Sequence, residues 1–188
     1  GGGTMRILIC YATTEGQTRK ICRFVADHLM DNGHSVELLS ADDGLDEASE
    51  LDLNRFDAAV LAGSVHVGKV QRALIEFASE LTDGFREMPV LYLQVSLAAA
   101  GKDAEERAEL ARIAEETVAA FGWTPAKVLQ VAGAFRFSEY DFFKAWAMRW
   151  IASQHGQTVA HGEDREYTDW RALAADVDAW AEAAAMSR

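Results

Sequence analysis

The feature that most constrains the fold is an alternation of short apolar runs with stretches whose apolar residues recur at helical spacing. The runs have strand length and cover Arg6–Tyr11, Ser35–Leu39, Ala58–Gly63, Val90–Val95 and Val128–Gly133. Between them, apolar residues fall three or four positions apart, as Leu110, Ile113 and Ala114 do. Strands that are apolar throughout and alternate with helices are typical of a parallel sheet covered on both faces. The pattern therefore predicts an α/β fold with a doubly wound, five-stranded parallel sheet.

The length of the chain favours one domain. It has 188 residues, of which 49% are hydrophobic and 26% charged, enough for one sizeable core. We interpret residues 1–4, ahead of Met5, as an added tag and expect residues 5–188 to form a single domain. Two helices, Ser138–Ser153 and Asp169–Ala185, are predicted after the fifth strand, although the minimal fold needs only one. We therefore expect an extra aromatic-rich helix and its linker within about residues 135–167.

Charge and composition exclude several classes of function. The formal net charge of −12 disfavours nucleic acid as a partner, since like charges repel. The two cysteines, Cys10 and Cys22, lie in apolar stretches, which is typical of buried thiols in a reducing cytoplasm. A membrane-spanning helix needs a run of about 18 apolar residues, and the sequence contains no such run. The five histidines lack metal-ligand spacing, so we expect no metal.

The turn after the first strand is the first candidate site. It runs from Ala12 to Thr18 and leads directly into a helix. Its hydroxyl groups, together with unpaired backbone N–H groups at a helix N-terminus, are suited to a phosphate. Alternatively, Thr13 or Thr14 only caps the helix and Gly16 only makes the turn. Neither a nucleoside triphosphate loop nor a dinucleotide fingerprint is present. The candidate residues are Thr13, Thr14, Glu15, Gly16, Gln17 and Thr18.

This turn resembles the FMN phosphate loop of the flavodoxin family. The shared pattern is Thr-x-x-Gly-x-Thr between a strand and a helix, with Glu15 where flavodoxins carry Thr. An acid followed by Gly16-Gln17-Thr18 resembles the menaquinone-dependent protoporphyrinogen oxidases, a flavodoxin-like subfamily of haem biosynthesis. The resemblance implies a noncovalently bound FMN. Glu15 is expected to point outward, because a carboxylate beside the phosphate would repel it.

Two further loops resemble those that hold the flavin ring in this subfamily. Gly63–Gly68 is similar to the Gly-x-Ser-Ile-x-x-Gly loop beside the ring, and Ser96–Ala98 to the small-residue loop on its other side. The second loop holds no acids, which favours two-electron chemistry over the low potential of electron-carrier flavodoxins. His66 is either a ligand of the flavin or of a substrate carboxylate, or a bystander. The candidate residues are Ser64, Val65, His66, Val67, Gly68, Ser96, Leu97 and Ala98.

Aromatic and basic residues follow the fifth strand, and a late Tyr167-Thr168-Asp169-Trp170 completes the resemblance. The aromatic residues either pack on the core or form a surface for lipid, quinone or porphyrin. Arg136 is a candidate partner of a propionate and, with His66, one of two candidate catalytic residues. Thr168 or Asp169 alternatively only caps the last helix. The surface candidates are Phe135, Arg136, Phe137, Tyr140, Phe143, Trp146 and Trp150.

The resemblance implies an FMN-dependent oxidoreductase that converts protoporphyrinogen IX to protoporphyrin IX and passes electrons to a quinone. Its implied partners are the porphyrinogen and the quinone, with possible peripheral contact to the cytoplasmic membrane. Two alternatives remain open, a flavodoxin-type electron carrier with an acidic docking surface and a flavin-dependent NAD(P)H:quinone reductase. A phosphoacceptor receiver is excluded, because the first and third strands end in Cys10-Tyr11 and Ala62-Gly63 and lack the required acids.

Overall fold

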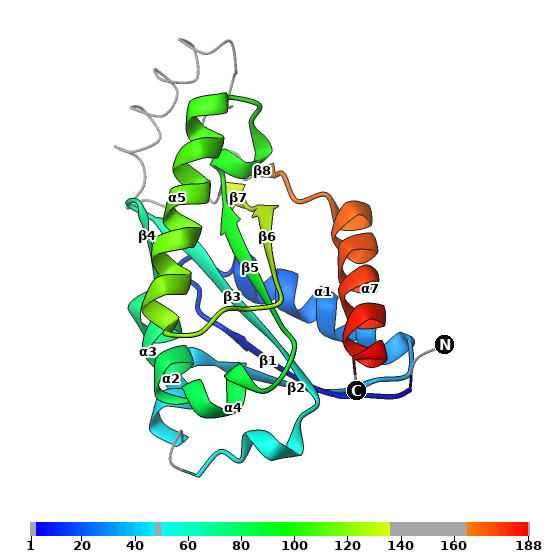
Figure 1. Cartoon of the computed structure of the whole chain (residues 1–188). Coiled ribbons are helices and arrows are strands. Elements are labelled where there is room, and N and C mark those ends of the chain that lie inside the picture. Colours follow the sequence, from blue (N-terminus) through cyan, green and yellow to red (C-terminus); the bar gives the residue numbers. More distant parts are fainter. Residues whose placement is uncertain (1–2, 48–49, 136–164, 188) are drawn as a thin grey trace.

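The computed structural model describes residues 3–47, 50–135 and 165–187, which form strands alternating with helices (Figure 1). In chain order the strands and helices are β1 (Arg6–Tyr11), α1 (Gln17–Asp31), β2 (Ser35–Ser40), α2 (Ala41–Glu47), β3 (Ala58–His66), β4 (Lys69–Val70), α3 (Arg72–Glu80), α4 (Thr82–Arg86), β5 (Val90–Ser96), α5 (Ala104–Phe121), β6 (Lys127–Ala132), β7 (Ala134–Phe135), β8 (Arg165–Glu166) and α7 (Trp170–Met186). Short 3-10 turns cover Leu53–Arg55 and Ala98–Ala100.

Five parallel strands form the central sheet in the order β2-β1-β3-β5-β6. β1 lies between β2 and β3, with Ile7 opposite Val36 on one side and Ala58 on the other. The order along the sheet therefore reverses at β1, which is where open α/β sheets bind ligands beyond the carboxyl ends of their strands. The predicted α/β, doubly wound, five-stranded parallel sheet is confirmed.

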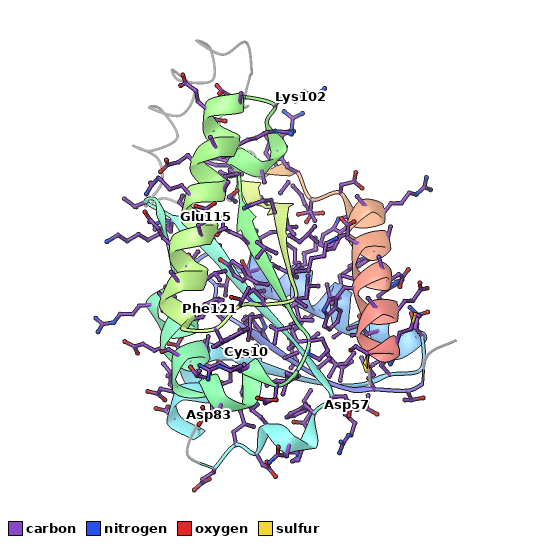
Figure 2. The ribbon with its side chains drawn as sticks, viewed as in Figure 1. Cys10, Asp57, Asp83, Lys102, Glu115 and Phe121 are labelled. Atoms are coloured by element: carbon purple, nitrogen blue, oxygen red, sulfur yellow. The ribbon has the colours of Figure 1, made fainter. Side chains whose placement is uncertain are left out.

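Helices cover both faces of this sheet. In Figure 1, α1 and α7 lie on one side and α3 and α5 on the other. Successive residues of β1 supply the two sides, since Ile7 and Ile9 pack in the cluster with α1 and α7, whereas Leu8 and Cys10 pack in the cluster with α3 and α5. All four side chains are at most 1% exposed. Figure 2 shows Cys10 and Phe121 between the layers and Glu115 outside.

The two edge strands depart from the expected two-sided burial. Leu38 in β2 is 37% exposed and Val128 in β6 is 39% exposed. Each of these strands has a sheet neighbour on one side only, and the helices do not reach fully over them. The apolar runs thus predicted the positions of the strands. Every residue is buried only in β5, while β1 and β3 are buried except at their ends.

The third strand is longer than predicted. Gly63–Gly68 was expected to be a turn, but β3 continues to His66 and pairs antiparallel with β4. The turn itself consists of Val67 and Gly68, which have φ values of +50° and +75°. Gly63 lies within β3, where a Cβ atom would come within 2.6 Å of Val70 Cγ1. Because Gly63 has no side chain, the Val70 side chain can pack directly against β3 at this position.

The chain after β6 makes a second, smaller sheet. β7 pairs antiparallel with β8, so that Phe135 lies opposite Arg165. Asp169 then caps α7, accepting a hydrogen bond from the Ala172 backbone N–H at 3.0 Å. The expected extra helix lies outside the described residues, as do Arg136, Phe137, Tyr140, Phe143, Trp146 and Trp150. Among the helices that the structure describes, none is long and apolar enough to cross a membrane.

Candidate functional site

A pocket of about 200 Å³ opens at the carboxyl ends of the parallel strands, beside the point where the strand order reverses. Its walls come from the turn after β1, from the ends of β3 and β5, and from β7 with the residue before it. The lining residues are Thr13, Thr14, Glu15, Gln17, Thr18, Ser64, Val65, His66, Val95, Ser96, Leu97, Gly133, Ala134 and Phe135. The pocket thus brings together the three loops in which the sequence predicted a site.

The turn after β1 directs the N-terminus of α1 at this pocket. Gly16, the residue before α1, has a φ of +92°, a left-handed conformation that glycine adopts without steric cost. Its backbone N–H donates to Thr13 Oγ1 at 2.8 Å, which holds the turn closed. The first backbone N–H groups of a helix have no partner within the helix, and the helix dipole favours an anion there. The turn therefore offers N–H groups and hydroxyls to one anionic group.

The buried hydroxyl of Thr18 indicates whether a phosphate fits at the start of α1. Its side chain is 1% exposed, and Oγ1 has no hydrogen-bond partner among the residues that the structure describes. A buried hydroxyl without a partner costs about 1–3 kcal/mol, so native proteins usually satisfy it. A phosphate oxygen at the start of α1 would satisfy Thr18 and the helix N–H groups together. The residues present therefore fit the phosphate of FMN.

The neighbouring strands β3 and β5 form a second wall of the pocket. Ser64 at the end of β3 lies opposite Val95 of β5 in the parallel ladder, and both line the pocket. Ser96 is 6% exposed, and its Oγ accepts a hydrogen bond from the Ala99 backbone N–H at 3.1 Å. The Ser96 hydroxyl therefore keeps its proton for another acceptor. Leu97 is 37% exposed and offers an apolar side chain at the rim.

Four of the predicted cofactor-binding residues, Gly16, Val67, Gly68 and Ala98, do not line the pocket. Gly16 donates its backbone N–H to Thr13, which does line the pocket, and Ala98 begins the 3-10 turn after β5. Val67 and Gly68 form the tip of the β3–β4 hairpin, where the Val67 side chain is 87% exposed. Glu15 lines the pocket and is exposed to solvent.

Phe135 and Gln71 are the main residues that sequence reasoning missed. Phe135 was grouped with a possible lipid surface, but it is 7% exposed and lines the pocket from β7. Its position just after the end of β6 was the available signal, since carboxyl ends of parallel strands converge on the same site. Gln71 does not line the pocket, but its side chain hydrogen-bonds Thr14 and Ser64, which do. No pattern in the sequence pointed to it.

The start of α1 is fastened to β8 by polar contacts around Glu166. Gln17 Nε2 donates to Glu166 Oε2 at 3.2 Å and to Thr168 Oγ1 at 3.1 Å. Lys20 Nζ donates to Glu166 Oε2 at 2.6 Å, and Trp170 Nε1 donates to Glu166 Oε1 at 2.8 Å. The Lys20 hydrogen bond is the largest reason why the pKa of Glu166 is lowered. This cluster, which we call the Glu166 latch, joins the start of α1 to β8 and to the start of α7.

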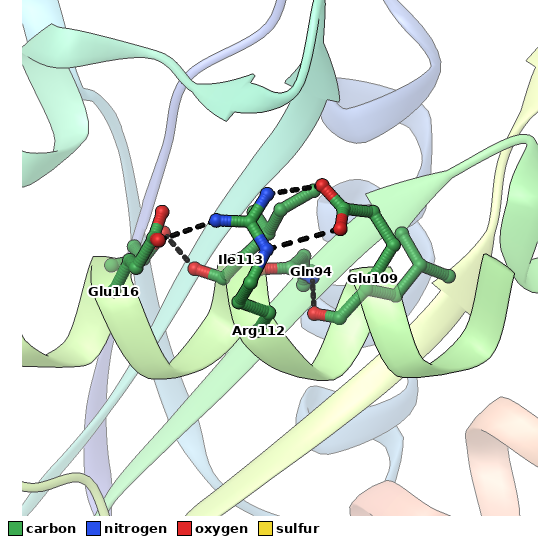
Figure 3. Close-up of polar contacts among 7 residues, drawn as sticks. Gln94, Glu109, Arg112, Ile113 and Glu116 are labelled. Atoms are coloured by element: carbon green, nitrogen blue, oxygen red, sulfur yellow. Dashed lines mark hydrogen bonds and ion pairs between the residues drawn. The ribbon is translucent and has the colours of Figure 1, made fainter. Parts of the chain in front are cut away.

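The polar residues of α5 have a structural role. Figure 3 shows Arg112 paired with Glu109 and Glu116 on α5, beside Gln94. Gln94 is fully buried and donates to the Leu110 backbone carbonyl at 2.9 Å, so it fixes α5 on β5. No group of three or more His, Cys, Asp or Glu is placed to hold a metal within residues 3–47, 50–135 and 165–187. The candidate chemistry of the described residues therefore lies in the pocket.

The fold and the pocket define an open α/β protein with a pocket suited to a phosphate-bearing cofactor at the switch point of its sheet. The chain belongs to the flavodoxin family, because residues 8–160 match the family model described as flavodoxin domain. Flavodoxins are flavin-dependent redox proteins, and this membership supports FMN as the cofactor, as the turn after the first strand predicted.

The chain is similar to proteins named protoporphyrinogen IX dehydrogenase [quinone]. The Escherichia coli (strain K12) protein is 24% identical over 170 residues, covering 90% of this chain and 91% of the relative. The Leishmania major protein is 24% identical over 169 residues, covering 89% of this chain and 71% of the relative.

Solved structures show the same fold at low identity. Oxidised flavodoxin 2 from Bacillus cereus has a TM-score of 0.56 at 19% identity, covering 95% of this chain and 99% of that one. A short-chain flavodoxin associated with a bacterial microcompartment has a TM-score of 0.54 at 14% identity, with 96% and 99% covered.

Proposed function

We propose that this chain holds FMN in the pocket, oxidises protoporphyrinogen IX to protoporphyrin IX and passes the electrons to a quinone. The observation that carries this proposal is the similarity over 90% of the chain to relatives named for that reaction. It is supported by the buried Thr18 hydroxyl of the pocket, which has no hydrogen-bond partner within the described part of the chain. Because quinones dissolve in lipid bilayers, the proposal includes peripheral contact of the protein with a membrane.

Residues of this chain bind and orient the cofactor. The hydroxyls of Thr13, Thr14 and Thr18, with the N-terminal N–H groups of α1, would hold the phosphate. Ser64 to His66 and Ser96 with Leu97 would lie on the two sides of the ring. The bound flavin supplies the two-electron redox chemistry, so the protein needs no catalytic triad or carboxylate pair.

The rim of the pocket suits an amphipathic, anionic substrate. His66 lies exposed at the end of β3, where its ring can donate a hydrogen bond to a propionate. Leu97 on the opposite wall offers an apolar contact for a flat tetrapyrrole. No acid occurs from Leu97 to Lys102, so this wall does not repel a carboxylate. Arg136, the other candidate for a propionate, lies outside the described residues.

The test is anaerobic mixing of the FMN-loaded protein with protoporphyrinogen IX, followed by a quinone. We expect the flavin absorbance near 450 nm to bleach with the porphyrinogen and to recover with the quinone. A flavin that stays oxidised in the presence of porphyrinogen would rule out the proposed substrate. Rapid bleaching by NADPH would instead identify a nicotinamide-dependent reductase.

A flavodoxin-type electron carrier is the second candidate, and the net charge of −12 favours it because acidic surfaces steer docking to redox partners. The same anaerobic experiment separates the two functions. A carrier would exchange electrons with a redox protein in a salt-dependent manner and would remain oxidised in the presence of the porphyrinogen.

A further inference from the structure

We propose that Gln71 is a positioning residue of the cofactor site, which ties the phosphate-binding turn to the end of β3 and presents the Thr14 and Ser64 hydroxyls to FMN as donors. The proposal rests on FMN binding as proposed above. Gln71 itself does not line the pocket, but both of the hydroxyls that it contacts do. It therefore acts on the cofactor only through these two residues.

Three hydrogen bonds define the contact. The Ser64 backbone N–H donates to Gln71 Oε1 at 2.9 Å. Gln71 Nε2 donates to Thr14 Oγ1 at 3.0 Å and to Ser64 Oγ at 2.5 Å. Thr14 belongs to the turn after β1 and Ser64 to the end of β3, so one side chain joins the two sides of the pocket.

The chemistry of these groups sets the direction of each hydrogen bond. A backbone N–H can only donate, so the Gln71 atom that it meets must be the carbonyl oxygen, and the amide nitrogen must face the two hydroxyls. Each hydroxyl then accepts from Gln71 and keeps its own proton. Those protons are available to acceptors in the pocket, a phosphate oxygen for Thr14 and an acceptor atom of the flavin for Ser64.

The local fold directs the amide of Gln71 away from its own helix. Gln71 is the residue before α3, a position whose side chain often caps the helix, yet here it makes no capping hydrogen bond. Gly63 makes the close approach possible. A Cβ atom there would lie 2.6 Å from Val70 Cγ1 and 3.3 Å from Gln71 Oε1, which would force the segment away from β3.

The test compares Gln71→Leu and Gln71→Glu in the apoprotein, with flavin fluorescence quenching as the measure of FMN and riboflavin dissociation constants. We expect Gln71→Leu to weaken FMN binding about tenfold, because the two hydroxyls lose their fixed orientation. The loss for riboflavin should be smaller, since riboflavin has no phosphate for Thr14. Arg72→Ala is the control, because the adjacent Arg72 side chain is 91% exposed and pairs with Glu76 on α3.

Gln71→Glu separates positioning from space filling. A carboxylate of the same shape accepts rather than donates, so it would draw both hydroxyl protons away from the ligand. We therefore expect Gln71→Glu to bind FMN more weakly than Gln71→Leu. FMN binding of Gln71→Glu at the wild-type level would overturn the proposal, because shape alone would then suffice.

A double-mutant cycle keeps the test decisive if a single variant loses stability. Thr14→Val should weaken FMN binding less in the Gln71→Leu background than in the wild type, because the two residues act together. Equal losses in both backgrounds would overturn the role of Gln71. If the wild type itself binds no FMN, the proposed function fails as well, and that outcome is distinct from a wild type that binds FMN beside unaffected variants.

Discussion

At the scale of single residues, the Thr18 side chain carries a buried polar group whose desolvation lowers the stability of the apoprotein. Its buried hydroxyl lacks a partner in the described structure. We predict that Thr18→Val, which keeps the shape, stabilises the apoprotein by about 1 kcal/mol and weakens FMN binding at least tenfold. Urea unfolding and flavin titration measure the two effects.

Thr117→Val is the control for this change. Thr117 is also buried, but its hydroxyl donates to the Ile113 carbonyl at 2.7 Å, away from the pocket. We expect it to lose stability without a change in FMN affinity. If Thr18→Val retained wild-type affinity, the phosphate site would have to lie elsewhere.

Val67 is a second residue whose conformation lowers the stability of the folded protein. Its φ of +50° is unfavourable for a β-branched side chain, and the side chain is 87% exposed. Because Asn followed by Gly suits a two-residue hairpin turn, Val67→Asn should raise the free energy of unfolding by about 1 kcal/mol. Val128→Asn, on an extended strand, should lower it. Urea denaturation checks both signs, and a destabilised Val67→Asn would show that the Val67 side chain makes compensating contacts.

At the scale of elements, the Glu166 latch joins α1 to β8 and makes stability depend on pH. The pKa of Glu166 is lowered from its usual value of 4.5, chiefly by the Lys20 hydrogen bond, so the carboxylate is favoured in the folded state. Its contribution is present above about pH 4.5 and is lost as the pH falls through the lower folded pKa.

We therefore predict that Glu166→Gln is less stable than the wild type at neutral pH, by about 1 kcal/mol or less, and that the difference shrinks in acid. Urea midpoints at several pH values measure this. Glu76→Gln is the control, because it removes an ion pair with Arg72 that lies within the single helix α3. A Glu166→Gln difference that does not vary with pH would contradict the role of the carboxylate charge.

The elements also show what the sequence alone could predict. Apolar runs located all five parallel strands, and the helical spacing of Leu110, Ile113 and Ala114 located α5, because the spacing of buried apolar residues can be read within each segment separately. The predicted end of the third strand was wrong, because the last residues of β3 form a strand only by pairing with β4. Gln71 and Phe135 were missed for a related reason. Their roles depend on contacts such as that between Gln71 and Thr14, which are 57 positions apart.

At the scale of the whole molecule, the net charge of −12 makes the folded state repel itself. Added salt screens this repulsion, with a Debye length of about 10 Å at 0.1 M. We predict that the melting temperature rises by a few degrees, on the order expected for about 1 kcal/mol, between low and moderate ionic strength. Differential scanning calorimetry in sodium chloride measures it, and a fall in melting temperature would show that attractive ion pairs dominate.

The pairing of Phe135 with Arg165 has a consequence for how such a protein can diversify. Directly opposed residues of an antiparallel pair lie about 5 Å apart, a gap that a two-residue turn can close. The distance between the two described residues Phe135 and Arg165 is therefore set by the β7–β8 pairing and not by the number of residues between them. Insertions and deletions between the two strands that preserve this pairing therefore leave Phe135 in the wall of the pocket.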